Sequence, residues 1–447
     1  MKIKQFEDKG LAQYAYAILS GCASEIVLVD PARDPQPYYD YAAENNANIV
    51  GVIETHPHAD FVSSHLEIHR KTGATIYTHS LVGADYPHQA FDEGALLKVG
   101  KIKLKALHTP GHSPDSISIV LEHEGKDKAV FTGDTLFIGD VGRSDLRESA
   151  GNVMAKREEL ARQMYKSTRE KLMKLADDVV VYPAHGAGSL CGKGLSDANT
   201  STIGDEKLGN YALKPMSEDE FVKVLTEDQP FIPKYFGYDV GLNKQGAPDY
   251  KPSIEGVVRL EKNFTPEDGA VIVDTRSEKV FKKGHYKGAI NIQNGGKFET
   301  WLGSIVSPNE SYYLVGEGEK QLNELISKAS KIGYELLVKG AFVYDKPEGE
   351  TSDTFDRSKF EENKDAYTIV DIRNTSEVKA GKFFDKAINI PLPELRERVK
   401  EIPTDKPVVV HCAGGYRSAA GSSILGAALP NVEVLDMSEA VTELKQK

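Results

Sequence analysis

Hydrophobic residues in the first part of the chain, residues 1–240, are grouped in short runs that polar and glycine-rich turns separate. Runs rich in valine and isoleucine predict strands, because β-branched side chains favour extended backbone. A different pattern covers residues 154–178, where apolar residues recur at helical spacing and predict a helix with one buried face. Together the two patterns predict a mixed α/β domain. The predicted strands are residues 25–30, 48–54, 74–79, 102–107, 117–122 and 128–134.

The remainder of the chain contains an internal repeat. The stretch "AVIVDTRSEKVFKKGHYKGAINI" (residues 270–292) matches "YTIVDIRNTSEVKAGKFFDKAINI" (residues 367–390). Each copy begins with a β-branched strand that ends in Asp-x-Arg, and each closes on the strand Ala-Ile-Asn-Ile. A strand, a helix and a second strand at this spacing predict a parallel α/β sheet, present twice.

Two polar, turn-rich stretches, residues 237–256 and 344–353, read as linkers. We therefore expect three domains, in keeping with the length of 447 residues. Their expected bounds are 1–245, 254–345 and 354–447.

The composition narrows the classes of function. A net charge of −12 argues against nucleic-acid or anionic-membrane partners, which require basic surfaces. No apolar run is long enough to span a bilayer, and the amino terminus lacks the apolar segment of a signal peptide. Three cysteines in so long a chain do not form a disulfide framework, so we expect a reducing, cytoplasmic location.

Histidines and aspartates follow the predicted strands, where α/β folds place their sites. The segment "THPHAD" follows one strand, and "HTPGHSPDS", "FTGDTLF" and "YPAHG" follow others. Side chains of these types, gathered beside glycine and proline, are typical of a metal site. The candidate ligands are His56, His58, Asp60, His112, Asp134 and His185.

In this order, the segments resemble the metallo-β-lactamase superfamily across nearly all of residues 1–240. The resemblance implies an αββα sandwich with a metal at one edge of its two sheets. In two-zinc members, the residue after the aspartate matching Asp60 is a histidine ligand. Here that residue is Phe61, which leaves the second zinc site one ligand short.

A mononuclear site fits the residues better. Two histidines and one carboxylate on one face are typical of non-haem Fe(II) oxygenases, which keep open positions for substrate and dioxygen. The persulfide dioxygenase branch of the superfamily is built in this way, and the resemblance implies His56, His112 and Asp134 as iron ligands. It implies positioning or substrate-binding roles for the remaining candidates: His58, Asp60, His185, Arg143 and Asp145. Cys191, in a glycine-rich loop after His185, is a candidate contact for a sulfur substrate or a loop cysteine without function.

The last repeat carries a second chemistry in "VVVHCAGGYRSAAG". A strand leads into Cys412, the loop residues Ala413, Gly414, Gly415 and Tyr416 follow, and Arg417 opens a helix. Converging backbone N–H groups, the helix N-terminus and the arginine all favour a thiolate and an added sulfur. This segment resembles an active rhodanese, with Cys412 and Arg417 as catalytic residues. The matching loop of the middle repeat, residues 316–321, has neither cysteine nor terminal arginine, so that domain is expected to be inactive.

The combined resemblance implies a fold and a function. The expected fold is an αββα metallo-β-lactamase sandwich followed by two rhodanese-like parallel α/β domains. The expected reaction is iron-dependent oxidation of a low-molecular-weight thiol persulfide to sulfite and thiol in sulfide detoxification, with Cys412 exchanging sulfur between persulfide, sulfite and thiosulfate. A zinc thioester hydrolase of the glyoxalase II type and a sulfur-carrier module are the alternatives. The resemblance also implies a homodimer.

Overall fold

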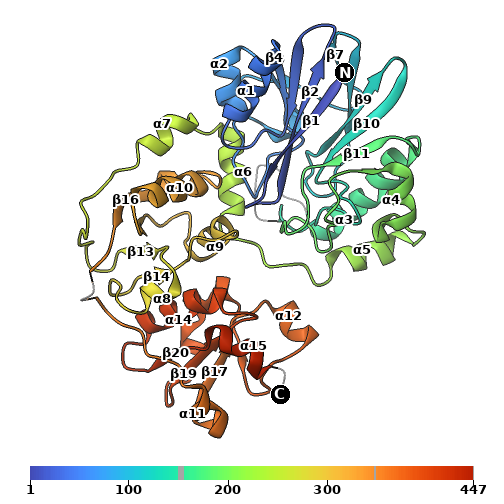
Figure 1. Cartoon of the computed structure of the whole chain (residues 1–447). Helices are drawn as coiled ribbons and strands as arrows, with labels where there is room; N and C mark the ends of the chain where they lie inside the picture. The colour runs from blue at the N-terminus through green and yellow to red at the C-terminus, as the bar shows by residue number, and fades with distance from the viewer. Residues whose placement is uncertain (149–155, 347–348, 446–447) are drawn as a thin grey trace. The chain divides into compact units, whose positions relative to one another are not determined.

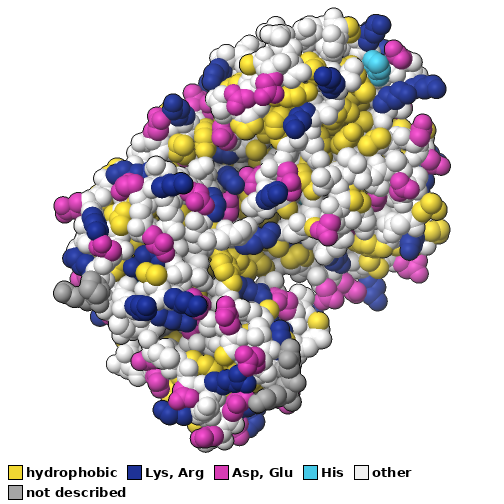
Figure 2. Space-filling model, viewed as in Figure 1, with side chains coloured by type: hydrophobic (Ala, Val, Ile, Leu, Met, Phe, Trp, Pro, Cys, Tyr) yellow, Lys and Arg dark blue, Asp and Glu magenta, His cyan; other side chains and the backbone are white. Residues whose placement is uncertain are grey.

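The computed structural model describes residues 1–148, 156–346 and 349–445 and is shown in Figure 1. The chain forms two compact units, Met1–Ser253 with Ser330–Gly333, and Ile254–Ala329 with Tyr334–Lys447. Within the part of the chain described, no helix is both long and apolar enough to cross a membrane. Acidic and basic side chains are interspersed on the face seen in Figure 2.

The first unit is built on two six-stranded sheets. In the first sheet the strands lie in sequence order, antiparallel from β1 to β3 and parallel from β3 to β6. The second sheet is antiparallel except for the parallel pair of β10 and β11. The first sheet comprises β1 (Lys2–Asp8), β2 (Gln13–Ser20), β3 (Glu25–Val29), β4 (Asn48–Ile53), β5 (Thr75–Thr78) and β6 (Gln89–Ala90). The second comprises β7 (Leu96–Val99), β8 (Ile102–His108), β9 (Ile117–His123), β10 (Lys126–Gly133), β11 (Val180–Pro183) and β12 (Ser201–Thr202).

The main core of this unit lies between the sheets. Tyr16 and Val27 of the first sheet share one buried cluster with Ile119 and Phe131 of the second. Alternate residues of each strand point outward and pack under helices, as the two-residue period of a strand requires. The predicted αββα sandwich is therefore confirmed. The helices are α1 (Gln36–Glu44), α2 (His65–Thr72), α3 (Arg157–Lys166), α4 (Ile203–Gly209), α5 (Glu218–Thr226), α6 (Phe236–Gln245) and α7 (Tyr250–Glu255).

The helix predicted over residues 154–178 is present but changes its winding. It is α-helical in α3, forms a π-turn over Ser167–Lys171, and ends in a 3₁₀ turn over Leu172–Lys174. Residues 154 and 155 lie outside the described residues. Leu160, Met164 and Leu172 are buried in the core as the pattern predicted.

Residues 237–256, expected to be a linker, are helical over most of their length, in α6 and α7, and the boundary between the two compact units lies within this stretch. Gly237 and Gly241 within α6 lower its intrinsic helix propensity, which concealed it in the sequence. Gly246 ends α6 with a positive φ of 84°. Asn243, on this helix, is buried and reaches the candidate metal site.

The second unit contains two four-stranded parallel sheets with the same strand order, β14-β13-β15-β16 and β18-β17-β19-β20. The repeat in the sequence is thus a repeat in topology. The strands are β13 (Val271–Asp274), β14 (Ile290–Asn291), β15 (Tyr312–Gly316), β16 (Val338–Val343), β17 (Thr368–Asp371), β18 (Ile388–Asn389), β19 (Val408–His411) and β20 (Val434–Asp436). The helices are α8 (Glu278–Phe281), α9 (Phe298–Ile305), α10 (Glu319–Ser330), α11 (Arg357–Glu362), α12 (Thr375–Ala380), α13 (Leu395–Arg398), α14 (Tyr416–Ala428) and α15 (Val441–Leu444).

The Asp-x-Arg motif has the same structural role in both copies. The guanidinium of Arg276 donates to both carboxylate oxygens of Asp274 and also to the carbonyl oxygen of Gly284. Arg373 makes the equivalent pair with Asp371. Since the motif is intact in the copy without cysteine, its purpose is to hold the loop after the strand.

Candidate functional site

The candidate metal ligands are carried by loops that leave the carboxyl ends of strands. His56 follows β4, His112 follows β8, Asp134 follows β10 and His185 follows β11. These strands belong to both sheets, so the loops converge from the two halves of the sandwich. The side chains of all four residues are buried.

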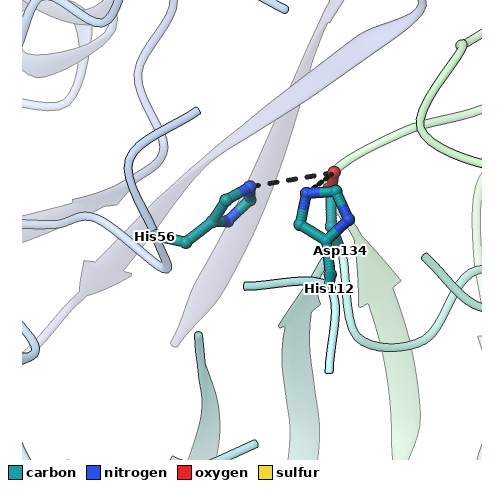
Figure 3. Close-up of side chains that lie close together, drawn as sticks. All are labelled: His56, His112 and Asp134. Carbon is teal, nitrogen blue, oxygen red and sulfur yellow. Dashed lines mark ion pairs between the residues drawn. The ribbon is translucent and has the colours of Figure 1, made fainter. Parts of the chain in front are cut away.

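His56, His112 and Asp134 lie together as predicted (Figure 3). The Oδ2 atom of Asp134 is 3.8 Å from Nε2 of His56 and 3.4 Å from Nε2 of His112. Metal–ligand bonds of about 2.1 Å place neighbouring donor atoms about 3.0–3.5 Å apart around a shared metal. The donor atoms therefore have the spacing of a slightly open metal site.

The hydrogen bonds behind the two histidines point both Nε2 atoms toward Asp134. Nδ1 of His112 lies 2.9 Å from the carbonyl oxygen of Arg143, which can only accept, so this nitrogen carries the proton. Nδ1 of His56 lies 3.0 Å from Oγ1 of Thr55, which itself donates to Asp30. Burial lowers the pKa of His112 and, with the neighbouring histidines, lowers that of His56 well below its usual value. Both imidazoles are therefore neutral, as metal ligands must be.

Among the described residues, Nε2 of His56 and both carboxylate oxygens of Asp134 have no hydrogen-bond partner although they are buried. Buried polar atoms without partners are costly and rare in folded proteins. A cation bound to these atoms removes that cost, so the residues present fit a metal. Two nitrogen donors and one carboxylate are a donor set suited to iron or zinc.

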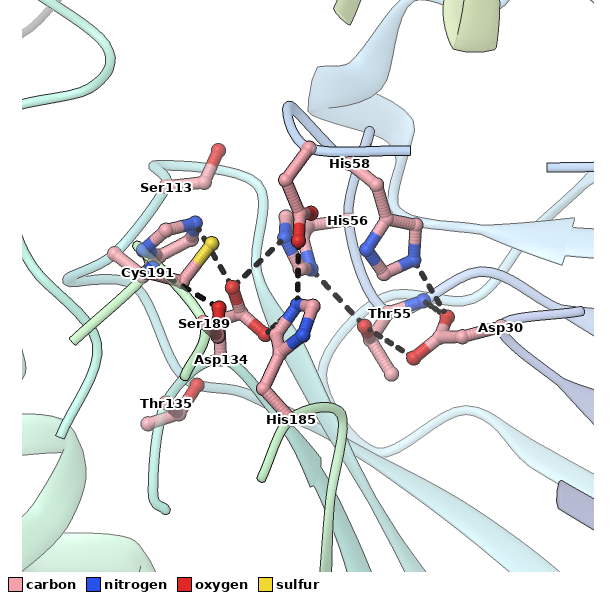
Figure 4. A network of polar contacts seen from close by, with 12 residues as sticks. Asp30, Thr55, His56, His58, Ser113, Asp134, Thr135, His185, Ser189 and Cys191 are labelled. Atoms are coloured by element: carbon pink, nitrogen blue, oxygen red, sulfur yellow. Dashed lines mark hydrogen bonds and ion pairs between the residues drawn. The ribbon is translucent and has the colours of Figure 1, made fainter. Parts of the chain in front are cut away.

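Asp60, His185 and Cys191 form a second cluster of possible metal ligands. Figure 4 shows His185 and Cys191 beside Asp134. Nε2 of His185 is 3.3 Å from Oδ2 of Asp60 and 3.5 Å from Oδ1 of Asp134. Burial alone would lower the pKa of His185, but these two carboxylates raise it to about 9. Burial and the same carboxylates raise the pKa of the Cys191 thiol well above its usual value. In the metal-free protein this side of the site therefore holds an imidazolium and a neutral thiol.

His58 is turned away from Asp134. Its Nε2 atom lies 3.1 Å from Oδ1 of Asp30 and 3.8 Å from Oε2 of Glu54, and its ring packs on Phe61 at 4.3 Å between centroids. Burial raises the pKa of Glu54 to about 8, so this carboxyl is protonated at neutral pH. His65 begins α2, and its Nδ1 atom lies 3.7 Å from Oε1 of Glu54. The buried ring of Phe61 therefore packs on His58 and offers no donor atom for a metal.

Arg143 positions neighbouring parts of the site by hydrogen bonds and does not itself lie among the candidate metal ligands. Its side chain is buried, pairs with both oxygens of Asp145 and donates to the carbonyl oxygen of Leu190. Its backbone N–H donates to the carbonyl oxygen of Cys191, while its own carbonyl oxygen accepts from His112. One residue therefore fixes a candidate metal ligand and the loop that carries Cys191.

Asn243 was missed by the sequence reasoning. Its amide donates to the carbonyl oxygens of His58 and Phe61, and its side-chain oxygen accepts from the backbone N–H of Ser63. These bonds hold the loop that bears His56 and Asp60. No signal in the sequence marked this residue, because its helix was read as a linker.

The segment from Cys412 to Arg417 has a strand before it and a helix after it, and one backbone N–H is directed at the sulfur. Cys412 is buried at the end of β19, and the backbone N–H of Gly415 donates to its sulfur at 3.1 Å. Arg417 donates to both oxygens of Glu377 at 2.6 and 2.7 Å. The positive charge of Arg417 near Cys412 is therefore partly balanced by the carboxylate of Glu377. Ala413, Gly414, Gly415 and Tyr416 form the connecting loop, and α14 begins at Tyr416.

In the middle repeat, the loop that matches the Cys412 loop contains no cysteine and is held by a hydrogen bond to a side-chain amide. The backbone N–H of Glu317 donates to the side-chain oxygen of Gln321 at 2.7 Å. The side chain of Gln321 therefore accepts the N–H of the loop, and the loop offers no nucleophile.

Both halves of the chain match models of known protein families. The model of the metallo-beta-lactamase superfamily matches residues 9–185, and the model of the rhodanese-like domain matches residues 259–346 and 356–439. The crystal structure of a metallo-beta-lactamase from Staphylococcus aureus subsp. aureus COL is 33% identical, with a TM-score of 0.68, over 76% of this chain and 98% of that one.

Two further relatives match the first half of the chain. The mitochondrial persulfide dioxygenase ETHE1 of Bos taurus is 28% identical over 52% of this chain and 82% of its own length. The hydroxyacylglutathione hydrolase GloC of Haemophilus influenzae is also 28% identical, over 42% of this chain and 88% of its own length. Sequence identity does not separate an oxidation from a hydrolysis here.

Proposed function

Because the chain belongs to the metallo-beta-lactamase superfamily and carries two rhodanese-like domains behind that first domain, we propose that it is a persulfide dioxygenase joined to a sulfurtransferase. The substrate is a low-molecular-weight thiol persulfide. Persulfide, dioxygen and water together supply the atoms of the free thiol and the sulfurous acid that result. This role places the protein in sulfide detoxification.

The proposal rests on one observation: the two oxygens of Asp134 face different candidate ligands. Its Oδ2 atom faces His56 and His112. Its Oδ1 atom faces His185, and Nε2 of His58 lies against Asp30 instead. What remains is two histidines and one carboxylate, the donor set of non-haem iron oxygenases. When bound there, Fe(II) supplies the open coordination positions and the redox chemistry that oxygenation of a persulfide requires.

The other residues of the site prepare it for an anionic sulfur substrate. Nε2 of His185 lies 3.5 Å from Oδ1 of Asp134 and offers a buried hydrogen-bonding group beside the candidate metal ligands. Arg143 holds the loop of Cys191, whose neutral thiol lines the same side. Burial of all these groups excludes bulk water and strengthens their electrostatic effect on a bound persulfide.

The sulfur-transfer step belongs to Cys412. Its thiolate attacks the outer sulfur of a donor, and the sulfur–sulfur bond of the donor breaks as the new one forms. The N–H of Gly415 stabilises negative charge on the attacking sulfur. Transfer of this outer sulfur to sulfite releases thiosulfate and regenerates the thiolate, and the reverse sequence consumes thiosulfate.

The test is oxygen consumption by anaerobically Fe(II)-loaded protein after addition of a thiol persulfide, with a zinc-loaded sample beside it. We expect uptake with iron only, and sulfite in proportion to the oxygen used. Absence of uptake across glutathione, coenzyme A and bacillithiol persulfides would contradict the dioxygenase. The variant Cys412→Ser separates the two steps, because it should keep oxygen uptake and lose thiosulfate formation.

One observation favours a second candidate, a zinc thioester hydrolase. Asp60, His185 and Cys191 offer donor atoms within 4.8 Å of one another, so Cys191 can replace the histidine absent at Phe61 and complete a second metal site. This candidate predicts two zinc ions per chain and cleavage of glutathione thioesters. One metal ion per chain and no thioester cleavage would exclude it.

We propose a cytoplasmic location and a homodimer. All three cysteines are free thiols, which favours a reducing compartment. The dimer is an expectation from the superfamily, and sedimentation of the full chain tests it.

A further inference from the structure

The domain without a catalytic cysteine contacts the sulfur-transfer loop of its neighbour. Both domains belong to the same compact unit. The hydroxyl of Tyr416 donates to the carbonyl oxygen of Gln293 at 2.8 Å. A Cβ atom added to Gly295 would lie 3.1 Å from the ring of Tyr416, closer than ordinary van der Waals contact. The turn at residues 293–295 therefore holds both the hydroxyl and the ring of the residue that follows Gly415.

The same loop has a second contact, through Ser438. A Cβ atom added to Gly415 would lie 3.0 Å from the backbone of Ser438, so the loop rests against this residue. The hydroxyl of Ser438 donates to Glu278 of the domain without cysteine at 2.7 Å. Lys282 of the same domain pairs with Asp436, two residues before Ser438, at 2.8 Å. The segment that packs against Gly415, residues 436–438, is therefore also bound to the domain without cysteine.

The backbone of Gly415 is the part of the loop that these contacts fix. Gly415 has a φ of 104°, a conformation that residues with a side chain rarely adopt, and its N–H points at the sulfur of Cys412. Tyr416 lies directly after it and Ser438 lies against it. A shift in either neighbour turns the N–H away from the sulfur and removes a hydrogen bond to the thiolate.

The sequence of the repeat agrees with this role. After the shared Ala-Ile-Asn-Ile, the middle domain continues Gln-Asn-Gly-Gly at residues 293–296, whereas the last domain continues Pro-Leu-Pro-Glu at residues 391–394. In the glycine-containing copy, the three atoms nearest to an added Cβ at Gly295 all belong to the ring and hydroxyl of Tyr416. The contact with Tyr416 therefore gives a reason for glycine at this position.

We propose that the domain without cysteine is a positioning element of the sulfur-transfer site, and that Gln293, Gly295 and Glu278 hold the Cys412 loop in its thiolate-stabilising conformation. The inference deepens the proposed function, because it assigns a task in sulfur transfer to the domain that carries no sulfur chemistry. It leaves the metal site of the first unit untouched.

The experiment compares Gly295→Val with Gly296→Val in the full-length protein. A Cβ at Gly296 meets nothing within 4 Å, so this neighbouring glycine is a matched control. Alkylation of Cys412 by iodoacetamide is followed across pH by mass spectrometry of its peptide. We expect Gly295→Val to move the pH midpoint upward and to slow alkylation at neutral pH roughly tenfold, the effect of losing one hydrogen bond to a charged sulfur. Gly296→Val should match the wild type.

Two milder variants keep the test decisive if Gly295→Val fails to fold. Tyr416→Phe removes the hydrogen bond to Gln293 and retains the ring, and Glu278→Gln weakens the bond to Ser438. Each should raise the midpoint by a smaller amount. Equal midpoints for the wild type, Tyr416→Phe, Glu278→Gln and any folded Gly295→Val would overturn the inference. Alkylation needs no substrate, so a failure of the proposed sulfur transfer would show separately, as a wild type that reacts with iodoacetamide but forms no thiosulfate.

Discussion

The side-chain amide of Asn243 donates a hydrogen bond to the carbonyl oxygen of Phe61 at 2.7 Å, across 182 positions of sequence. The same side chain binds the carbonyl oxygen of His58 and the N–H of Ser63. It therefore satisfies three buried backbone groups of the loop that carries His56. The position of one metal ligand depends on a residue from the last helices of the domain.

Asn243→Ala should weaken metal binding. The variant leaves the carbonyl oxygens without their donor, at a cost of about 1–3 kcal/mol, and loosens His56. Loss of such a supporting contact typically lowers metal affinity about 10- to 100-fold. Competition with a chelator of known affinity measures the effect. Gly241→Ala, in the same helix with open space around the new Cβ, should stabilise the helix by about 0.5–1 kcal/mol and leave affinity unchanged.

Asp134→Asn should abolish stabilisation of the protein by metal. At a free metal concentration of 100 times the dissociation constant, binding raises the free energy of unfolding by about 2.7 kcal/mol. Thermal unfolding with Fe(II) and with a chelator, under nitrogen, should therefore differ for the wild type and coincide for the variant. Asp127→Asn, an exposed carboxylate at the start of the same strand, should behave as the wild type. A metal-dependent shift that survives in Asp134→Asn would show that the metal binds elsewhere.

The cysteines of the first unit should react with alkylating agents at very different rates. Cys22 is exposed, and a hydrogen bond from Ser20 lowers its pKa, so it is the richer in thiolate at neutral pH. Cys191 is buried with a pKa raised well above its usual value, so thiol and access both oppose reaction. Time-resolved peptide mapping at pH 7.5 should find Cys22 modified first. Early modification of Cys191 would contradict the closed loop held by Arg143.

Glu377→Gln should destabilise the second unit at neutral pH. Burial raises the pKa of Glu377, but the hydrogen bonds from Arg417 outweigh it and lower the pKa below the usual 4.5. The folded-state pKa is depressed, so the stabilisation is complete above pH 4.5 and is lost as the pH falls through the folded value. After allowance for partial exposure, the loss at pH 7 should be about 1 kcal/mol.

Urea unfolding followed by the fluorescence of Trp301, the single tryptophan, measures this loss in the second unit. The difference between the variant and the wild type should shrink once the pH falls below 4.5. Glu394→Gln removes an exposed partner of Arg398 and should cost about 0.5 kcal/mol or less. A larger effect at acidic than at neutral pH would refute the assignment.

The sequence was sufficient to predict what depends on short motifs. The six-residue segment from Thr55 and the isolated His112 and Asp134 lie at strand ends, and strand ends of a sandwich meet at one edge. The Cys412 loop is likewise local, with strand, turn and helix in one segment. The fold class followed from the same patterns, because periodicity distinguishes strands from helices even without a partner for either.

Contacts between distant segments could not be predicted. The ion pair of His58 with Asp30 joins the segments that follow two different strands, β4 and β3. The pairing of Arg417 depends on Glu377, which lies on α12. The first two strands of the chain were also missed, since every residue of Gln13–Ser20 is buried and the segment has no alternation to read. Such features arise only when the whole domain is folded.

The dependence of the metal loop on α6 also has a meaning for biosynthesis. A ribosome has completed His56, His112, Asp134 and His185 well before it adds Asn243. Until that residue emerges, the carbonyl oxygens of His58 and Phe61 lack the donor that orders their loop. A nascent chain that ends after α5 therefore contains every candidate ligand but lacks the hydrogen bonds that Asn243 gives to the loop of His56.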